Sequence, residues 1–267
     1  MHTISVRALL IRLLVCFAAS SASLHAADTV TVAHRGAWKA LGLPENSLAS
    51  LRHAIGIGCA GAEFDVWMTS DDSLVVNHDP LHQGMPIEET SYGVLRSRPL
   101  ANGELLPSLR EYLRAGLDTS VRTRLVLEVK PSRLGAERGV RTARAVVRLA
   151  REFSAGSRIL FISFDGGILA AIRDLDPGAE LQYLNGDKTP EELRASGING
   201  ADYHLSVYRK HPEWIGRAKA CGIALNAWTV NSAADMDWLI GEGFTFITTN
   251  EPELLKERLD AFGHRQE

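Results

Sequence analysis

The chain has 267 residues, of which 45% are hydrophobic and 23% are charged, so it can bury a sizeable core and is not a disordered chain. A net charge of -3 argues against the basic surface of a protein that binds nucleic acid or an anionic membrane. These totals favour a globular protein whose partner is a small molecule.

The first segment has the pattern of a signal peptide. A basic start is followed by an apolar stretch over 8–19, interrupted by Arg12, and then by small residues up to Ala26. The stretch is too short to span a bilayer and no second one follows, so no membrane anchor is expected. We expect a mature chain over 27–267 that is periplasmic or secreted. Cys16 lacks the usual context of a lipid-anchored cysteine.

Short apolar runs alternate with helical stretches along the rest of the chain. Strands are predicted at Val30–Ala33, Ala62–Met68, Leu125–Val129, Ile159–Ser163, Glu180–Leu184, Ala201–His204, Ala224–Thr229 and Phe244–Thr248. Helices are predicted at Ser47–Ile57, Ala136–Phe153, Gly167–Leu175, Pro190–Ser196, Pro212–Cys221, Ala233–Gly241 and Pro252–Phe262. This pattern predicts the α/β class and a (β/α)8 barrel in one domain. A doubly wound open sheet is the alternative, but no glycine-rich dinucleotide fingerprint follows the first strand.

One segment breaks the alternation between the second and third barrel strands. Leu74–Asn77 is predicted as a small extra strand, and Leu81–Pro107 is irregular and contains three prolines. Loops of this length inside compact domains are usually functional or disordered. Because the segment leaves the top of a strand, where barrel enzymes build their sites, we expect a small inserted lobe at about residues 80–110 over the active site.

Carboxylates cluster near the predicted ends of two strands, where a barrel places its catalytic groups. Glu63 and Asp65 are two residues apart in the second strand, so their side chains share a face, and Glu128 and Lys130 are spaced in the same way. Carboxylates gathered in one barrel mouth repel one another unless a cation lies between them. Oxygen ligands suit Mg²⁺ or Ca²⁺ better than Zn²⁺, so we expect one divalent cation.

Two histidines accompany this acidic group. His34 closes the first strand and is followed by Arg35, while His78 follows the small extra strand. A histidine beside a carboxylate cluster is a candidate for proton transfer. The alternative is that these charged residues form a structural ion-pair network, but buried charges rarely offset their own desolvation through stability alone.

The order of these motifs resembles the glycerophosphodiester phosphodiesterase family. The matching motifs are His34-Arg35-Gly36, Pro44-Glu45-Asn46-Ser47, Glu63-x-Asp65, His78-Asp79, Glu128-x-Lys130, Ile162-Ser163-Phe164, Trp228-Thr229-Val230-Asn231 and Thr249-Asn250-Glu251-Pro252. Each motif is weak alone, but together they cover nearly the whole mature chain. The resemblance implies a (β/α)8 barrel, a single divalent cation, and hydrolysis of glycerophosphodiesters to sn-glycerol 3-phosphate and an alcohol.

The resemblance also implies a role for particular residues. By this resemblance, the metal ligands are Glu63, Asp65 and Glu128. The acid–base pair is His34 and His78, and the side chains that bind the phosphate are Arg35 and Lys130. Glu45 is either a partner of Arg35 or lies near the metal. Phe164 and Trp228 stand at strand ends, where they pack against the glycerol carbons or belong to the barrel core.

Two other functions are compatible with the same barrel. A lipid-directed phosphodiesterase, of the phosphatidylinositol phospholipase C or lysophospholipase D type, would need an apolar rim around its pocket. The predicted lobe instead carries charges such as Glu88, Glu89, Arg96 and Arg98, which favour a water-soluble diester. A non-catalytic binding protein would lack an essential group, and none is missing here. The alcohol headgroup, the oligomeric state and the division of labour between the histidines stay open.

Overall fold

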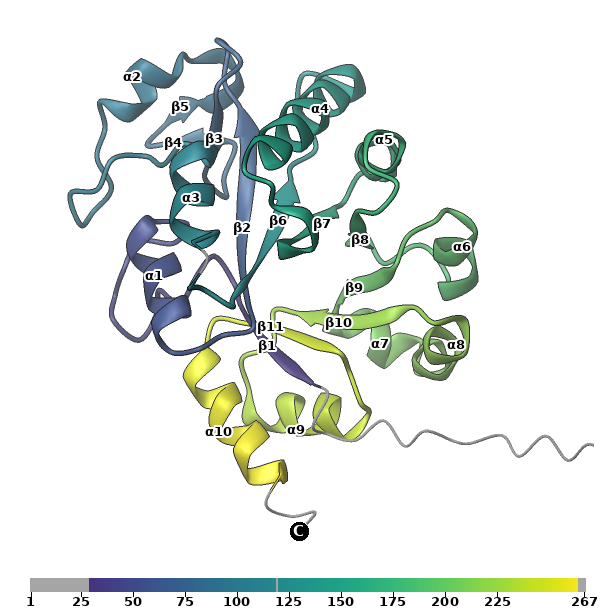
Figure 1. The fold of residues 1–267 in the computed structure, drawn as a ribbon. Coiled ribbons are helices and arrows are strands. Elements are labelled where there is room, and N and C mark those ends of the chain that lie inside the picture. Colours follow the sequence, from purple (N-terminus) through teal and green to yellow (C-terminus); the bar gives the residue numbers. More distant parts are fainter. Residues whose placement is uncertain (1–28, 119, 264–267) are drawn as a thin grey trace, which may run out of the picture.

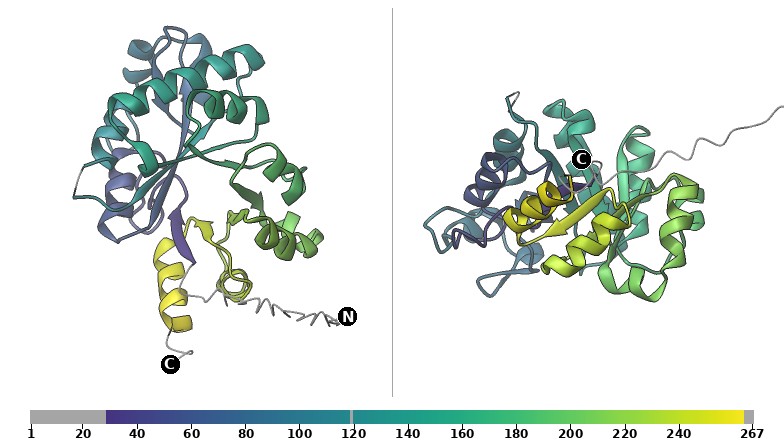
Figure 2. Two further views of the ribbon diagram at one scale, coloured as in Figure 1. Left: turned by 45° about the vertical axis from the view of Figure 1, so that its right-hand side comes forward. Right: turned by 90° about the horizontal axis from the view of Figure 1, so that it is seen from below.

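The computed structural model describes residues 29–118 and 120–263, so the predicted signal peptide and Cys16 lie outside the described residues. Strands occupy the middle of the molecule and helices lie around them (Figures 1 and 2). Eight parallel strands form the central sheet: β1 (Val30–Ala33), β2 (Gly61–Met68), β6 (Arg124–Val129), β7 (Ile159–Ser163), β8 (Glu180–Tyr183), β9 (Gly200–His204), β10 (Ala224–Trp228) and β11 (Phe246–Thr249). Each strand pairs with its neighbour, and β1 pairs with both β2 and β11, which closes the sheet into a barrel.

Helices cross over between the strands on the outside of the barrel. They are α1 (Leu48–Gly56), α3 (Leu109–Gly116), α4 (Ala136–Glu152), α5 (Gly166–Leu175), α6 (Pro190–Ala195), α7 (Leu205–Lys210), α8 (Glu213–Cys221), α9 (Ala233–Gly241) and α10 (Pro252–Gly263). The predicted (β/α)8 barrel of the α/β class is therefore confirmed. None of the helices in the described part of the chain is long and apolar enough to cross a membrane.

The predicted lobe after the second strand is also present. The predicted extra strand is β3 (Leu74–Val76), which runs antiparallel to β2. The lobe follows it and contains the short elements β4 (Leu81–His82), β5 (Met85–Pro86), the 3-10 turn Ile87–Glu89 and α2 (Tyr92–Arg96). These elements lie together at the upper left of Figure 1. A small apolar cluster of its own, which includes Trp67, Ile87 and Leu106, holds the lobe against the end of β2.

Three helices were not predicted: α2, in the segment expected to be irregular, α3 and α7. The start of α3 is nevertheless marked in the local sequence by a capping box. Ser108 accepts a hydrogen bond from the backbone N–H of Glu111, and the Glu111 carboxylate accepts one from the backbone N–H of Ser108. The eighth strand was predicted to begin at Phe244 but begins at Phe246. Phe244 is fully buried beneath the helices, so the apolar run extends beyond the strand itself.

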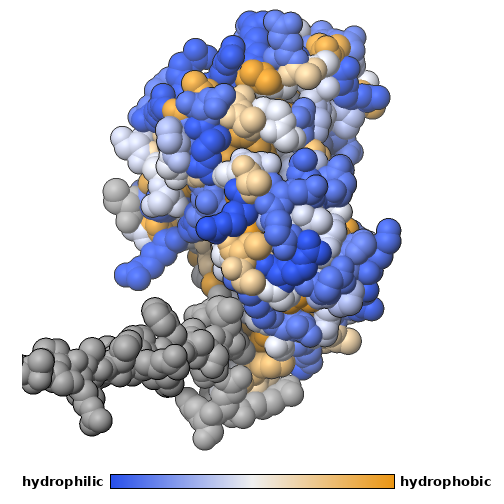
Figure 3. Space-filling model, turned by 90° about the vertical axis from the view of Figure 1, so that its right-hand side faces the viewer, coloured by the Kyte–Doolittle hydropathy of each residue, from blue (hydrophilic) through white to orange (hydrophobic). Residues whose placement is uncertain are grey.

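Side chains alternate between two apolar regions. Phe64 and Val66 face the helices and join the large outer core, in which Phe64 stacks on Tyr112 of α3. Val32, Val126 and the residues packed with them fill the inside of the barrel. The molecular face in Figure 3 is mostly hydrophilic, with hydrophobic residues scattered over it rather than gathered into one broad patch.

Candidate active site

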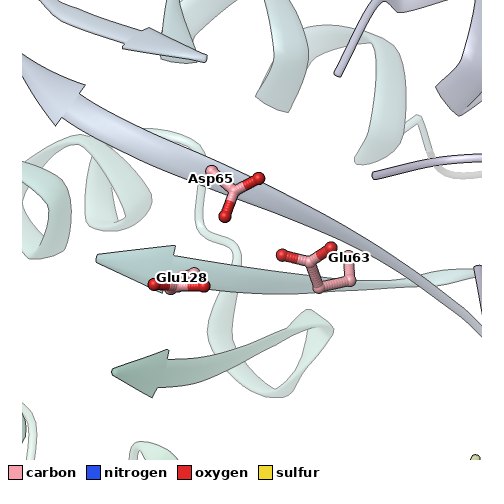
Figure 4. A group of neighbouring side chains, drawn as sticks. All are labelled: Glu63, Asp65 and Glu128. Atoms are coloured by element: carbon pink, nitrogen blue, oxygen red, sulfur yellow. The ribbon is translucent and has the colours of Figure 1, made fainter. Parts of the chain in front are cut away.

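Three buried carboxylates meet inside the barrel. Glu63, Asp65 and Glu128 each offer one oxygen, and these oxygens lie within 4.8 Å of one another. Figure 4 shows Glu63 and Asp65 projecting from β2 and Glu128 from the neighbouring β6. The parallel register pairs Asp65 with Glu128, so the strand alternation that turns Phe64 outward turns all three acids inward.

Two side chains stabilise the negative charge of Asp65. The Lys130 ammonium lies 2.7 Å from one Asp65 oxygen, and the Asn46 amide donates a hydrogen bond of 2.7 Å to the other. The backbone N–H of Asp65 in turn donates to Asn46 Oδ1. Burial alone would raise the pKa of Asp65, but Lys130, His78 and Asn46 outweigh it and lower the pKa to about 2.

The other two acids are held less firmly in the charged form. Burial, together with the charges of Asp65 and Glu128, raises the pKa of Glu63 well above its ordinary range. Burial raises the pKa of Glu128 to about 8, although Lys130 opposes the shift. Without a further positive charge, burial and the neighbouring carboxylates therefore favour the protonated form of these two acids.

The donor set fits a divalent cation. Glu128 Oε1 is buried and lies 3.0 Å from Lys130 Nζ, and no other group among the described residues donates a hydrogen bond to it. Three ionised carboxylates against one ammonium leave a formal charge of -2, and all the ligand atoms are oxygens. Such a group could bind a hard ion of the Mg²⁺ or Ca²⁺ kind.

The loop after β1 carries the first histidine and arginine to the same place. The backbone N–H of Arg35 donates to a Glu63 oxygen at 2.8 Å, and the Arg35 guanidinium pairs with Glu45 at 2.6 Å. Gly36 makes the tight turn possible, because it has a φ of +78° and an added Cβ would lie 2.5 Å from Ser50 Oγ. Arg35 itself has a φ of +56°.

His34 is mostly buried, and a neighbouring amide fixes its orientation. Nδ1 lies 2.7 Å from Asn250 Oδ1, and because an amide oxygen only accepts, Nδ1 carries the hydrogen. Nε2 is then the unprotonated nitrogen, and it lies 4.0 Å from a Glu63 oxygen. Burial and the charge of Arg35 lower the pKa of His34 to about 4, so the ring is neutral at pH 7.

His78 stands at the mouth of the pocket. It follows β3, its side chain is 36% exposed, and its Nδ1 lies 2.8 Å from the Asp79 carboxylate. The same pocket is lined by His34 and by the charged strand residues Glu63, Glu128 and Lys130. The turn between β3 and the lobe therefore brings a second histidine to the pocket that the barrel strands form.

Aromatic and aliphatic side chains from β7, β8, β10 and the loops that follow these strands form another part of the pocket wall. Phe164 and Trp228 are half-buried and meet edge to face, with ring centroids 5.6 Å apart. Ile162 and Leu184 continue this wall toward the barrel interior. The pocket thus has a charged side and an apolar side, which suits a ligand with a phosphate and a short carbon chain.

Comparison with known proteins identifies the family. The model of the Glycerophosphoryl diester phosphodiesterase family matches residues 34–254, a span that contains every candidate residue described above. The chain belongs to this family.

Relatives in the phosphodiesterase family match over most of their length. A glycerophosphodiester phosphodiesterase from Caldanaerobacter subterraneus is 27% identical over an alignment of 242 positions, and the match covers 85% of this chain and 96% of the relative. One from Bacillus subtilis is 25% identical over an alignment of 269 positions, and the match covers 89% of each chain. The crystal structure of a glycerophosphodiester phosphodiesterase from Parabacteroides distasonis is 38% identical, with a TM-score of 0.86, and the match covers 88% of this chain and 98% of that one.

The structure of this phosphodiesterase family member brings the predicted residues together. The three carboxylates, both histidines, Arg35, Lys130, Phe164 and Trp228 line one pocket or lie directly beside it. Glu45 lies against Arg35 and is not one of the three clustered acids.

The structure gives roles to Asn46, Asn250 and Asp202 that sequence reasoning did not assign, whereas a cap on the first helix at Asn46 or Ser47 was expected. Asn46 orients Asp65 and Asn250 orients His34, although both stand in motifs that the sequence offered. Ser47, next to Asn46, caps α1 by accepting a hydrogen bond from the backbone N–H of Ser50. Asp202 lines the pocket from β9, where no motif marks it.

Proposed function

We propose that this family member is a metal-dependent phosphodiesterase that hydrolyses glycerophosphodiesters to sn-glycerol 3-phosphate and an alcohol. The observation that carries the proposal is a single pocket in which three clustered carboxylates, a neutral histidine and a lysine face one another. Family membership supports the reaction class: the chain is an enzyme of the glycerophosphodiester phosphodiesterase kind.

Glu63, Asp65 and Glu128 would hold one divalent cation, Mg²⁺ or Ca²⁺. A cation there would neutralise negative charge that grows on the phosphoryl oxygens in the transition state. The positively charged side chains of Arg35 and Lys130 line the same pocket and would bind the phosphate oxygens. Phe164 and Trp228 would pack against the carbons of the glycerol unit.

His34 and His78 would move the protons. His34 Nε2 is unprotonated and faces the pocket, so it would take the proton of the attacking hydroxyl as the new P–O bond forms. His78, whose Nδ1 lies against the Asp79 carboxylate, would give a proton to the alcohol oxygen as the old P–O bond breaks. The attacking hydroxyl is either a water or the substrate's own 2-hydroxyl, which would give a cyclic phosphate that water then opens.

A substrate panel tests this function. The purified protein is incubated with glycerophosphodiesters of choline, ethanolamine, glycerol and inositol, with and without a chelator, and glycerol 3-phosphate is measured. We expect release that stops on chelation and returns with Mg²⁺ or Ca²⁺. Glu63→Gln should lose turnover, while Glu257→Gln, exposed on α10, is the matched control and should keep it. Turnover that survives chelation would remove the metal from the proposal, and no release from any diester would overturn it.

We also propose that the chain is exported to the periplasm or secreted, on the strength of the leader pattern over residues 1–26. Sequencing of the N-terminus of the protein recovered from the periplasm or the medium should find Ala27 or Asp28. Recovery of the uncleaved chain from the cytoplasm alone would contradict export.

A further inference from the structure

Asp202 is a buried carboxyl that no part of the proposed chemistry uses. It belongs to β9, is 1% exposed and lines the pocket. Its Oδ1 has no hydrogen-bond partner among the described residues. A buried polar group without a partner destabilises a fold, so such a group calls for a partner that arrives from outside the chain.

The neighbouring polar residues of the barrel interior do not satisfy Asp202. Asn226 donates to Gln182 at 3.3 Å and accepts from Thr248 at 3.1 Å, so these three side chains bond to one another. Tyr203 and Ala201, on either side of Asp202, face the outer core, which leaves Asp202 pointing into the barrel. The carboxyl therefore stands in the pocket wall and outside the interior network.

The barrel places Asp202 across the pocket from the metal ligands. The closed sheet has eight strands, and β9 is four strands away from β2 in either direction, so the two strands are opposite each other. Trp228 Nε1 donates a hydrogen bond of 2.9 Å to the Asp202 carbonyl, which fixes the indole beside this residue. Asp202 is thus the acid on the side of the pocket that lies across from β2, beside Trp228.

The protonation state of Asp202 is compatible with an anionic ligand. Burial raises its pKa to about 8, and no charged group contributes to the shift. At neutral pH the carboxyl is protonated, so it does not repel a phosphate and can both donate and accept a hydrogen bond. An alcohol hydroxyl has the same two capacities and is the matching partner.

We propose that Asp202 binds the terminal hydroxyl of the substrate's glycerol unit and makes the pocket selective for a hydroxylated chain. The assignment rests on the proposed function, which sets the phosphate at the charged side. In glycerol 3-phosphate the 2-hydroxyl is one carbon from the phosphate-bearing carbon, whereas the terminal hydroxyl is the farthest polar group from the phosphorus. It is the group that reaches across the pocket toward β9, while the carbons lie along Phe164 and Trp228.

Inhibition by two product analogues tests the assignment. The ligands are sn-glycerol 3-phosphate and the matching propane-1,2-diol phosphate, which lacks only the terminal hydroxyl. The wild type should bind the first about five- to tenfold more tightly, which is the effect of one neutral hydrogen bond. Asp202→Leu should bring this ratio to about one and leave the affinity for the deoxy ligand unchanged, because that ligand never uses the carboxyl.

Asp202→Asn is the matched control. Its amide has the same shape and can also donate and accept, so it should keep most of the wild-type ratio. Asp202→Ala replaces the leucine variant if that variant does not fold, and should also abolish the ratio. A ratio in Asp202→Leu or Asp202→Ala equal to that of the wild type, or an equal loss of affinity for both ligands, would overturn the assignment.

The two proposals fail in different ways. A wild type that releases glycerol 3-phosphate from diesters yet binds both analogues equally would overturn the role of Asp202 and leave the function intact. A wild type that releases no glycerol 3-phosphate and binds neither analogue would overturn both.

Discussion

Replacing Glu128 by glutamine separates the cation-binding role of the three carboxylates from a structural one. Without a cation, burial raises the pKa of Glu128 to about 8, so at pH 7 its carboxyl is neutral. Glutamine has nearly the same shape and is also neutral. We therefore expect Glu128→Gln to change the free energy of unfolding of the chelated protein by less than about 1 kcal/mol.

The cation should stabilise only the wild type. A ligand that binds the folded state at 100 times its Kd adds about 2.7 kcal/mol to the free energy of unfolding. For a chain of this size each kcal/mol raises Tm by about 2–4 °C, so the expected increase is about 5–11 °C. Glu128→Gln lacks one of the three clustered carboxylates and should lose most of that increase at the same cation concentration.

Calorimetric melting of both proteins, with chelator and with Mg²⁺ or Ca²⁺, measures these shifts. Glu257→Gln on α10 is the control and should gain as much Tm as the wild type. The reasoning is refuted if Glu128→Gln gains the full increase with cation, or if it loses several kcal/mol of stability in chelator. The second result would mean that Glu128 acts as a buried ion-pair partner instead.

Three further predictions concern the turn, the histidine and the lobe. Gly36→Ala should unfold or destabilise the protein by at least about 1 kcal/mol in denaturant melts, because its Cβ would clash with Ser50 at a φ of +78°. Asn250→Ala should lower kcat roughly tenfold with little change in KM, because His34 loses the acceptor that fixes its tautomer; an unchanged kcat would remove Asn250 from the site. Glu111→Gln should lower the free energy of unfolding by about 1 kcal/mol at pH 7, after allowance for solvent screening. Hydrogen bonds from Arg96 on α2 lower the pKa of Glu111 to about 2. The difference in unfolding free energy between variant and wild type should therefore vanish as pH falls from about 4.5 to 2. A difference that persists at pH 2 would contradict this origin.

Most strands and helices of the barrel could be predicted because the sequence patterns that indicate them are local. Buried strands such as Ile159–Ser163 are continuous apolar runs, and helices such as Ala136–Glu152 have a clear apolar face, so both are visible without any tertiary information. The helix Leu109–Gly116 was missed although its capping box is local, because the prolines before it suggested an irregular segment. Leu205–Lys210 is too short for periodicity to mark it.

The candidate site could likewise be predicted only in part, where its residues are close together in the sequence. The spacing of Glu63 and Asp65 fixes their common face, so their meeting could be predicted from β2 alone. Asn250 is 216 residues from His34, and no spacing rule brings the two together. Asp202 stands out only when the missing hydrogen-bond partner is known, which requires the packed barrel.

The closure of the barrel through β1 makes the site dependent on the last strand to be synthesised. Asn250 directly follows β11, and β11 pairs with the strand that leads into His34. A ribosome-bound chain that ends before β11 can contain every carboxylate, both histidines and the lysine, yet it has no partner for the His34 ring and one open side in its barrel. Catalytic competence should therefore appear late in biosynthesis, in one step, when the final strand and the α10 helix behind it join the first strand.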